Sequence, residues 1–265
     1  FIGNKKARDV FRKKKIYKWI NQIVLKDYLK IRKELDSLNL VIENKDVFKV
    51  YKSLSEYDLK LSKMKREFAN QRIDLSLKSD VKKKLLFMVE IDQYMRNQTK
   101  VPFENKYNEN ETEFFNKEFD HRFGSLDYQN IKDLKEILKL YRWLIISEFG
   151  EKADRNAWLI VQHADNNPAF QKSVLKILGY LWRVKETNAA NYAYLYDRVQ
   201  ASFSDIGQQK PQRYGTQGKC IGPGKWRPIA IEDAENVDIR RAEVGLPSLE
   251  SYIEGFKDIC KGIKL

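Results

Sequence analysis

One of the two histidines of this chain stands in a segment rich in groups that can transfer protons. Residues 158–171 read WLIVQHADNNPAFQ and contain His163. Imidazole changes its charge near neutral pH, so His163 is the first candidate for a general acid or base. At 100° per residue it lies at the edge of a buried helical face, which is formed by Ala157, Ile160, Val161 and Ala164. A polar residue on the flank of a core helix is the competing interpretation.

Asp165 follows His163 by two positions, which on a continuing helix places the two side chains on different sides. They can share a site only if the helix ends near Ala164, as Asn167-Pro168 favours. The spacing alone therefore predicts a turn or capping role for Asp165.

A second polar cluster is the stretch PQRYGTQ, which we expect to form a strand or the approach to one. Alternation along a strand points Gln212, Tyr214 and Thr216 one way, while Arg213 and Gln217 need not join them. Such groups around a glycine suit a pocket that binds a polar ligand. A polar edge hairpin with no ligand is the alternative.

Further charged residues offer partners for these groups. Asp92 and Arg96 have i, i+4 spacing, which is equally typical of an exposed ion pair. Asp197 and Arg198 are adjacent, diverge by 100° on a helix and must bind other elements. Arg241 either binds an anion or anchors the C-terminal helix.

Several kinds of site are not indicated. The sequence contains no P-loop, no GxGxxG, no HExxH and no GxSxG, and we expect no cofactor. The distance between the two histidines makes a zinc site unfavourable, so we expect no metal. Cys220 and Cys260 lack metal-ligand spacing but could pair if the fold brings them together.

The net charge of +13 is concentrated at the N-terminus, where residues 1–30 carry about +8. These residues could dock to a protein or nucleic acid, or could be a solvated helix start rich in lysine. No run of apolar residues is long enough to cross a membrane. The chain begins with Phe1, so localisation stays open: cytoplasmic, or exported if a removed signal precedes Phe1.

The elements that must position these residues are mainly helical. Apolar spacing predicts two long helices near 10–38 and 47–68, an antiparallel hairpin within a basic extension over residues 1–84. A compact helical domain over 85–265 would begin with a helix at 85–98. Residues 99–128 are polar and acidic, particularly 103–120, and predict a loop or lid.

Helical periodicity returns at 130–150 and continues through 153–164, 169–186 and 188–203. Asn167 should cap the third of these helices, with Pro168 in its first turn. A small β-hairpin is expected near 212–232, turning at Gly222-Pro223-Gly224, and the chain should end in helices. The predicted fold class is thus mainly α with one small β-hairpin.

Taken in order, these segments resemble a bacterial domain family of unknown function. Its pattern runs D-Q-x-x-R, Q-H-A-D with a following F-Q, D-R-V and Q-x-Y-G-T-Q, and the resemblance covers about residues 85–258. Members tend to carry a G-W-P element before the histidine helix, where this chain has SEFGEKAD. The resemblance brings no activity with it. It implies that the following positions belong together: Asp92, Gln93, Arg96, Gln162, His163, Asp165, Asp197, Arg198, Gln212, Tyr214, Gly215, Thr216, Gln217 and Arg241.

Because polar residues dominate that set, we expect a pocket centred on His163. His163 would be the acid or base, with Asp92 or Asp197 orienting it or supplying a second carboxylate. The remaining residues would hold a small phosphate- or carboxylate-bearing substrate of a hydrolase or transferase: Arg96, Gln162, Arg198, Gln212, Tyr214, Thr216, Gln217 and Arg241. A non-catalytic binding module with a basic docking arm and a buried polar network without a ligand are the alternatives.

Overall fold

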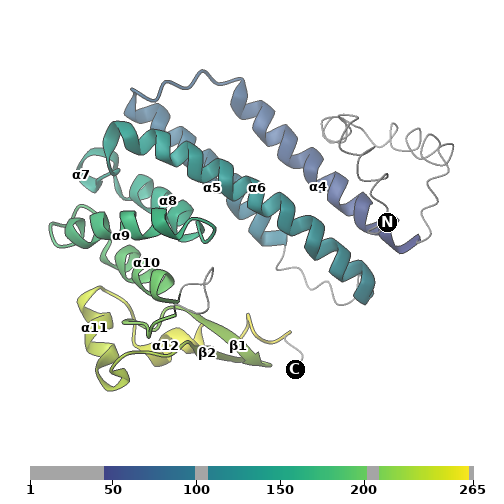
Figure 1. The fold of residues 1–265 in the computed structure, drawn as a ribbon. Helices are drawn as coiled ribbons and strands as arrows, with labels where there is room; N and C mark the ends of the chain where they lie inside the picture. The colour runs from purple at the N-terminus through teal and green to yellow at the C-terminus, as the bar shows by residue number, and fades with distance from the viewer. Residues whose placement is uncertain (1–44, 99–106, 202–208, 263–265) are drawn as a thin grey trace. The chain divides into compact units, whose positions relative to one another are not determined.

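The computed structural model describes residues 45–98, 107–201 and 209–262, and these residues are mainly helical with one small β-hairpin (Figure 1). The predicted fold class is confirmed for this part of the chain. The chain divides into two compact units, one of Phe1–Arg72 with Asn97–Phe123 and one of Ile73–Arg96 with Gly124–Leu265. The first predicted helix and the basic residues 1–30 lie outside the described residues.

In the first unit, α4 (Lys45–Ala69) packs against the N-terminal half of α6 (Glu109–Tyr141). The contact combines a ring pair, Tyr57 with Phe119, and an ion pair in which the Arg122 guanidinium binds Asp58 at 3.0 Å. The second of the two predicted N-terminal helices is thereby confirmed as α4.

The predicted loop or lid over residues 99–128 is wrong from Glu109 onward, because α6 begins there. The acid-rich composition concealed a regular apolar stripe, in which Phe115, Phe119 and Leu126 are buried at helical spacing. Asn108 starts the helix by accepting a hydrogen bond from the Glu111 amide, and the Glu111 carboxylate accepts one from the Asn108 amide.

The core of the second unit is formed by α5 (Lys78–Gln98), the C-terminal half of α6, α8 (Glu151–Gln162), α9 (Pro168–Leu181) and α10 (Ala189–Ala201). Lys84 of α5 binds Asp133 of α6 at 2.5 Å. Figure 1 shows α8, α9 and α10 as neighbours along the green part of the chain. Their buried apolar residues form one cluster, which includes Leu85, Leu134, Ile160, Val174 and Leu195.

The helix predicted over residues 130–150 is interrupted. α6 ends at Tyr141, Arg142 adopts a positive φ of 57°, and the short helix α7 (Ile146–Phe149) follows. The indole of Trp143 donates to buried Asp154 at 2.8 Å, which holds this bend against α8. Gly150, with φ of 80°, separates α7 from α8.

The predicted start of α9 is confirmed. The Asn167 side chain accepts a hydrogen bond from the Phe170 amide at 3.2 Å, and Pro168 occupies the first turn. The end of the preceding helix is therefore fixed close to His163, which is the C-cap residue of α8.

The predicted hairpin is confirmed as β1 (Gly218–Gly222) and β2 (Lys225–Pro228), which pair antiparallel. It is followed by the 3-10 helix η3 (Ala234–Asn236), α11 (Val237–Glu243) and α12 (Leu249–Glu254). Cys220 and Cys260 form a disulfide between the hairpin and the C-terminal turns. Of the helices in the described ranges, none is long and apolar enough to cross a membrane.

Candidate active site

The candidate site is centred on two side chains, Asp92 from α5 and His163 from the end of α8. The Nδ1 atom of His163 lies 3.0 Å from Oδ2 and 3.1 Å from Oδ1 of Asp92. Asp92 is almost fully buried, whereas the side chain of His163 keeps 17% of its surface exposed. The end of α8 at Gln162 lets the imidazole leave the helical face and reach α5.

This contact assigns the proton on the imidazole. Ionised Asp92 can only accept, so Nδ1 carries the hydrogen and donates it. The lone pair of the neutral ring then lies on Nε2. No hydrogen bond from Nε2 to any residue in the described ranges is formed. The arrangement is that of a histidine base oriented by a carboxylate.

The surroundings keep His163 neutral. Burial lowers the pKa of His163 below its ordinary value of 6.5, and the positive charges of Arg96 and Arg198 add to this effect. The hydrogen bond and negative charge of Asp92 oppose the shift without reversing it. At neutral pH the imidazole is therefore in the form that accepts a proton.

Arg96 links Asp92, the partner of His163, to a second carboxylate. Its Nε donates to Asp92 Oδ1 at 3.0 Å, and its Nη2 donates to Asp127 Oδ1 of α6 at 3.1 Å. Burial tends to raise the pKa of Asp92, but the contacts with His163, Arg96 and the Gln93 amide outweigh it and lower that pKa. Asp92 is thus ionised as the orientation of His163 requires.

Asp127 has the opposite character. Burial raises the pKa of Asp127 to about 7, and the charges of Asp92 and Asp165 reinforce that shift against the attraction of Arg96. The site therefore contains a carboxyl group that can hold a proton near neutral pH, linked through Arg96 and Asp92 to a histidine that is neutral at that pH.

Asp165 and Arg198 form the other side of the cluster. Arg198 Nε donates to Asp165 Oδ1 at 2.9 Å, and Arg198 Nη2 pairs with Asp165 Oδ2. Gln171 donates to Asp165 at 3.2 Å, and Arg198 Nη1 donates to Gln217 Oε1 at 3.0 Å. Arg198, on α10, is thus held in place by Asp165 in the turn between α8 and α9 and by Gln217 in the segment before β1.

Asp197 does not lie with His163. It is fully buried, and its two carboxylate oxygens accept hydrogen bonds from the backbone amides of Arg213, Tyr214 and Thr216 at 2.8–3.1 Å. Burial raises the pKa of Asp197, although these three amides counteract the shift. Its partners are those of a loop anchor, and the prediction that Asp197 could orient His163 finds no contact to support it.

The segment 212–217 is the approach to β1, the second of the two predicted alternatives, with a single isolated bridge between Gln212 and Ile231. Gln212 Nε2 donates to the carbonyls of Gln217 and Ile229, and Gln212 Oε1 accepts from the Gln217 amide at 2.6 Å. Gly215 has φ of 67°, and a Cβ there would lie 2.6 Å from Ile231. The polar side chains of this loop mostly form hydrogen bonds with other groups of the loop.

Tyr214 and Thr216, which were also predicted to bind a ligand, pack within this loop structure instead. Tyr214 is buried and makes edge contacts with the rings of Tyr192 and Tyr196. Thr216 is buried, and its hydroxyl accepts a hydrogen bond from Gln217 Nε2 at 3.0 Å. Of the predicted residues in this loop, Gln217 is the one that reaches Arg198.

Arg241 is fully buried behind that loop. Its Nε donates to the Pro247 carbonyl at 2.6 Å, its Nη1 donates to the Tyr214 carbonyl, and its guanidinium lies 4.8 Å from the centre of the Tyr252 ring. These contacts anchor the C-terminal helices, which was one of the two predicted roles. Gln162 is buried on α8, and its Oε1 has no hydrogen-bond partner in the described part of the chain.

A family model described as a family of unknown function, DUF6624, matches residues 79–265. The chain belongs to the DUF6624 family. No curated protein matches it, and no solved structure matches it either.

The DUF6624 match includes every residue of the cluster around His163. It begins at residue 79 and extends to residue 265, a wider span than the 85–258 of the resemblance seen in the sequence. α4 lies outside the match. The pair formed by His163 and Asp92, the arginines Arg96 and Arg198, and the loop anchored by Asp197 lie inside it.

One member of the cluster in this DUF6624 domain, Asp127, was missed in the sequence. It lies in the stretch taken for a loop, where a carboxylate had no expected neighbours. The signal that would have found it is the continuous burial of Phe119, Leu126 and Leu134, which places Asp127 on a helix facing α5. Among the described residues, no group of three or more His, Cys, Asp or Glu could hold a metal ion.

Proposed function

We propose that this DUF6624 domain is an acid/base enzyme, a hydrolase or transferase in which His163 is the general base. The contact of His163 Nδ1 with Asp92 at 3.0 Å is the observation that carries the proposal, because it directs the lone pair of Nε2 away from α5. In this role His163 removes a proton from a water molecule or a substrate hydroxyl. Both cysteines are paired in a disulfide, so neither is a free nucleophile.

Asp92 is the orienting residue in this proposal. It fixes the imidazole tautomer and stabilises the imidazolium that forms when Nε2 takes a proton. Asp127 is the second titrating group, a carboxyl that can return a proton to a leaving group near neutral pH.

The substrate in the proposal carries a phosphate or carboxylate group. Arg96 and Arg198 supply the positive charge, but both already bind aspartates. In this proposal an anionic group replaces Asp127 at Arg96 Nη2, and this exchange is favoured when Asp127 is protonated, because a neutral carboxyl binds a guanidinium less strongly. Binding of the anion should accordingly strengthen as the pH falls through 7.

A screen for turnover tests the proposal directly. The parent, His163→Gln and a matched control, His121→Gln, are assayed against phosphomonoesters, phosphodiesters and carboxylic esters. His121 is exposed on α6 and lies in the other unit of the chain. We expect His163→Gln to lower kcat by about a hundredfold or more and His121→Gln to leave it unchanged. Equal activity of parent and His163→Gln would contradict the assignment.

The accessibility of Nε2 is tested without a substrate. Diethyl pyrocarbonate acylates neutral imidazole, and this chain has two histidines to distinguish. In the His121→Gln protein we expect one histidine to react at pH 7, more slowly as the pH falls through the lowered pKa of His163. If His163 of that protein is not acylated at pH 7, its Nε2 is closed to solvent and the proposal fails.

A further inference from the structure

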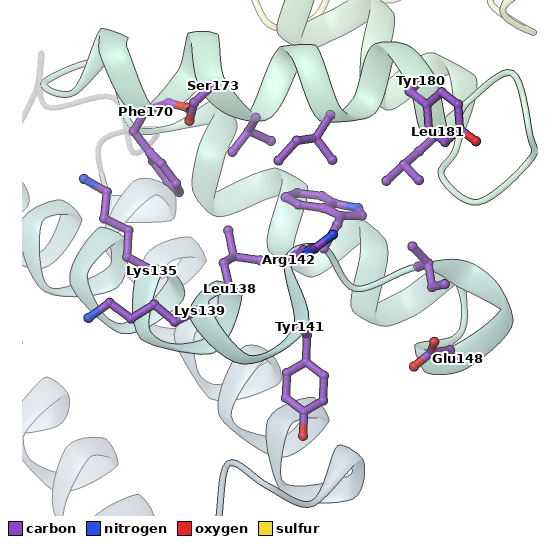
Figure 2. Close-up of a pocket in the computed structure, with 14 residues that line it drawn as sticks. Lys135, Leu138, Lys139, Tyr141, Arg142, Glu148, Phe170, Ser173, Tyr180 and Leu181 are labelled. Atoms are coloured by element: carbon purple, nitrogen blue, oxygen red, sulfur yellow. Dashed lines mark hydrogen bonds between the residues drawn. The ribbon is translucent and has the colours of Figure 1, made fainter.

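A groove lies between the C-terminal end of α6 and α9, and it shares no lining residue with the cluster around His163. Its volume is about 780 Å³. Figure 2 shows Lys135, Leu138 and Lys139 of α6 facing Phe170 and Ser173 of α9, with Tyr180 and Leu181 at the opposite end. The remaining lining residues are Tyr141, Arg142, Trp143, Ile145, Glu148, Val174 and Ile177.

The groove has the dimensions of a helix. On α9 the lining residues run from Phe170 to Leu181, a length of about 16 Å along the helix axis, or three turns. On α6 they are Lys135, Leu138, Lys139 and Tyr141, and Arg142 follows directly after the helix ends. Two helical rows that converge in this way form a trough into which the side chains of a third helix can pack.

The wall of the groove is apolar and partly open to solvent. Trp143 is buried in the core, whereas Ile177 is 36% exposed and Tyr180 is 67% exposed on the α9 side. Apolar side chains exposed together along a concave surface are typical of a surface that binds a partner.

The α6 rim is basic. Lys135 and Lys139 lie along it, and Arg142 follows just past the end of α6. The one carboxylate in the lining, Glu148, is already neutralised by Lys78 at 2.7 Å. Lys139 has Glu136 as a neighbour at 2.7 Å, so a net positive charge remains along this edge.

We propose that this groove binds an acidic amphipathic helix of a partner protein. One apolar stripe of that helix packs along the α9 row between Val174 and Leu181, and its flanking Asp or Glu side chains lie against the basic rim of α6. The N-terminal residues 1–30 of the chain itself do not have this chemistry, because their charge of about +8 has the sign of the rim. The inference is independent of any activity of His163.

Binding of synthetic peptides to the full-length chain tests the inference. The probe is a fluorescent peptide of about 15 residues, with leucines at i, i+4, i+7 and i+11 and glutamates beside them. A second peptide has lysine in place of each glutamate, and a third has serine in place of each leucine. Fluorescence anisotropy gives the Kd of each peptide, at low and at high ionic strength.

Three variants locate the binding. Lys139→Glu with Arg142→Glu reverses two exposed charges of the rim, and Ile177→Asp places a charge on the apolar wall. Lys176→Glu is a single charge reversal at an exposed position of α9 that does not line the groove, and it is the control. We expect the Kd of the acidic peptide to rise about tenfold in the double rim variant, and we expect that variant to bind the lysine peptide instead. Ile177→Asp should weaken binding of the acidic peptide, and Lys176→Glu should change the Kd of that peptide by no more than about twofold.

Several outcomes would overturn the inference. The acidic peptide could fail to bind the parent, or Lys176→Glu could weaken it as much as the rim variant does. Sedimentation could show self-association that Ile177→Asp abolishes, which would assign the groove to a second copy of the chain. Binding of the parent to vesicles of anionic phospholipid, lost in the rim variant, together with no binding of the acidic peptide, would assign it to a membrane surface.

Discussion

Asp92 and His163 are separated by 71 positions in the chain, and their side chains lie 3.0 Å apart. One is almost fully buried on α5, and the other caps the end of α8 with part of its ring exposed. This relationship sets both the tautomer and the charge of the imidazole, and the first prediction concerns it.

Asp92→Asn should lower the pKa of His163 further. Burial already lowers that pKa, and the hydrogen bond and the negative charge of Asp92 are the two contributions that raise it. Asparagine removes the charge and weakens the hydrogen bond. An NMR titration of the two histidines measures the effect, with exposed His121 as the internal reference. An unchanged or higher pKa of His163 would show that Asp92 does not control its proton.

Asp127→Asn should stabilise the protein more at pH 8 than at pH 5. The pKa of Asp127 is about 7 in the folded chain against an ordinary 3.8, so the folded state binds more protons between these values. Stability is therefore lost as the pH rises from about 4 to about 7, and asparagine removes that loss. The difference in the free energy of unfolding should be on the order of 2 kcal/mol, measured by urea denaturation at both pH values. A benefit that is equal at both would mean that Asp127 ionises normally.

Asp197→Ala should destabilise the fold, because Asp197 anchors the loop 212–217. The substitution leaves the backbone amides of Arg213, Tyr214 and Thr216, two of them buried, without an acceptor. We expect a loss of about 3 kcal/mol or more in the free energy of unfolding. Asp197→Asn keeps one oxygen and should lose less. Hydrogen exchange should show faster exchange at these three amides, and unchanged exchange there would refute the anchoring role.

Reduction of the Cys220–Cys260 disulfide should lower the melting temperature. The bond closes a loop with a sequence separation of 40, for which the gain in stability is about 3 to 4 kcal/mol. Melting with and without a thiol reductant measures the change. The double variant Cys220→Ser with Cys260→Ser is the control, because its melting temperature should already be lower and should not respond to the reductant.

The helical elements were largely predictable because helical periodicity is a local property. The stripes that define α4, α8, α9 and α10 repeat within four residues, and the Asn167 cap uses a side chain and an amide three positions apart. The start of α6 was mispredicted because polar composition was given more weight than the spacing of Phe115 and Phe119.

The sequence by itself determined the fold class, most helix bounds and the presence of polar groups capable of acid/base chemistry. Only the tertiary structure decided that Asp92, and not Asp197, meets His163, and that Asp127 joins them. Both Asp92 and Asp197 are aspartates on helices near an arginine, so their local sequences do not distinguish them. The distinction depends on how α5, α6, α8 and α10 pack, since a hydrogen bond forms only when two groups approach within about 3 Å, and packing of apolar faces distant in sequence sets that approach.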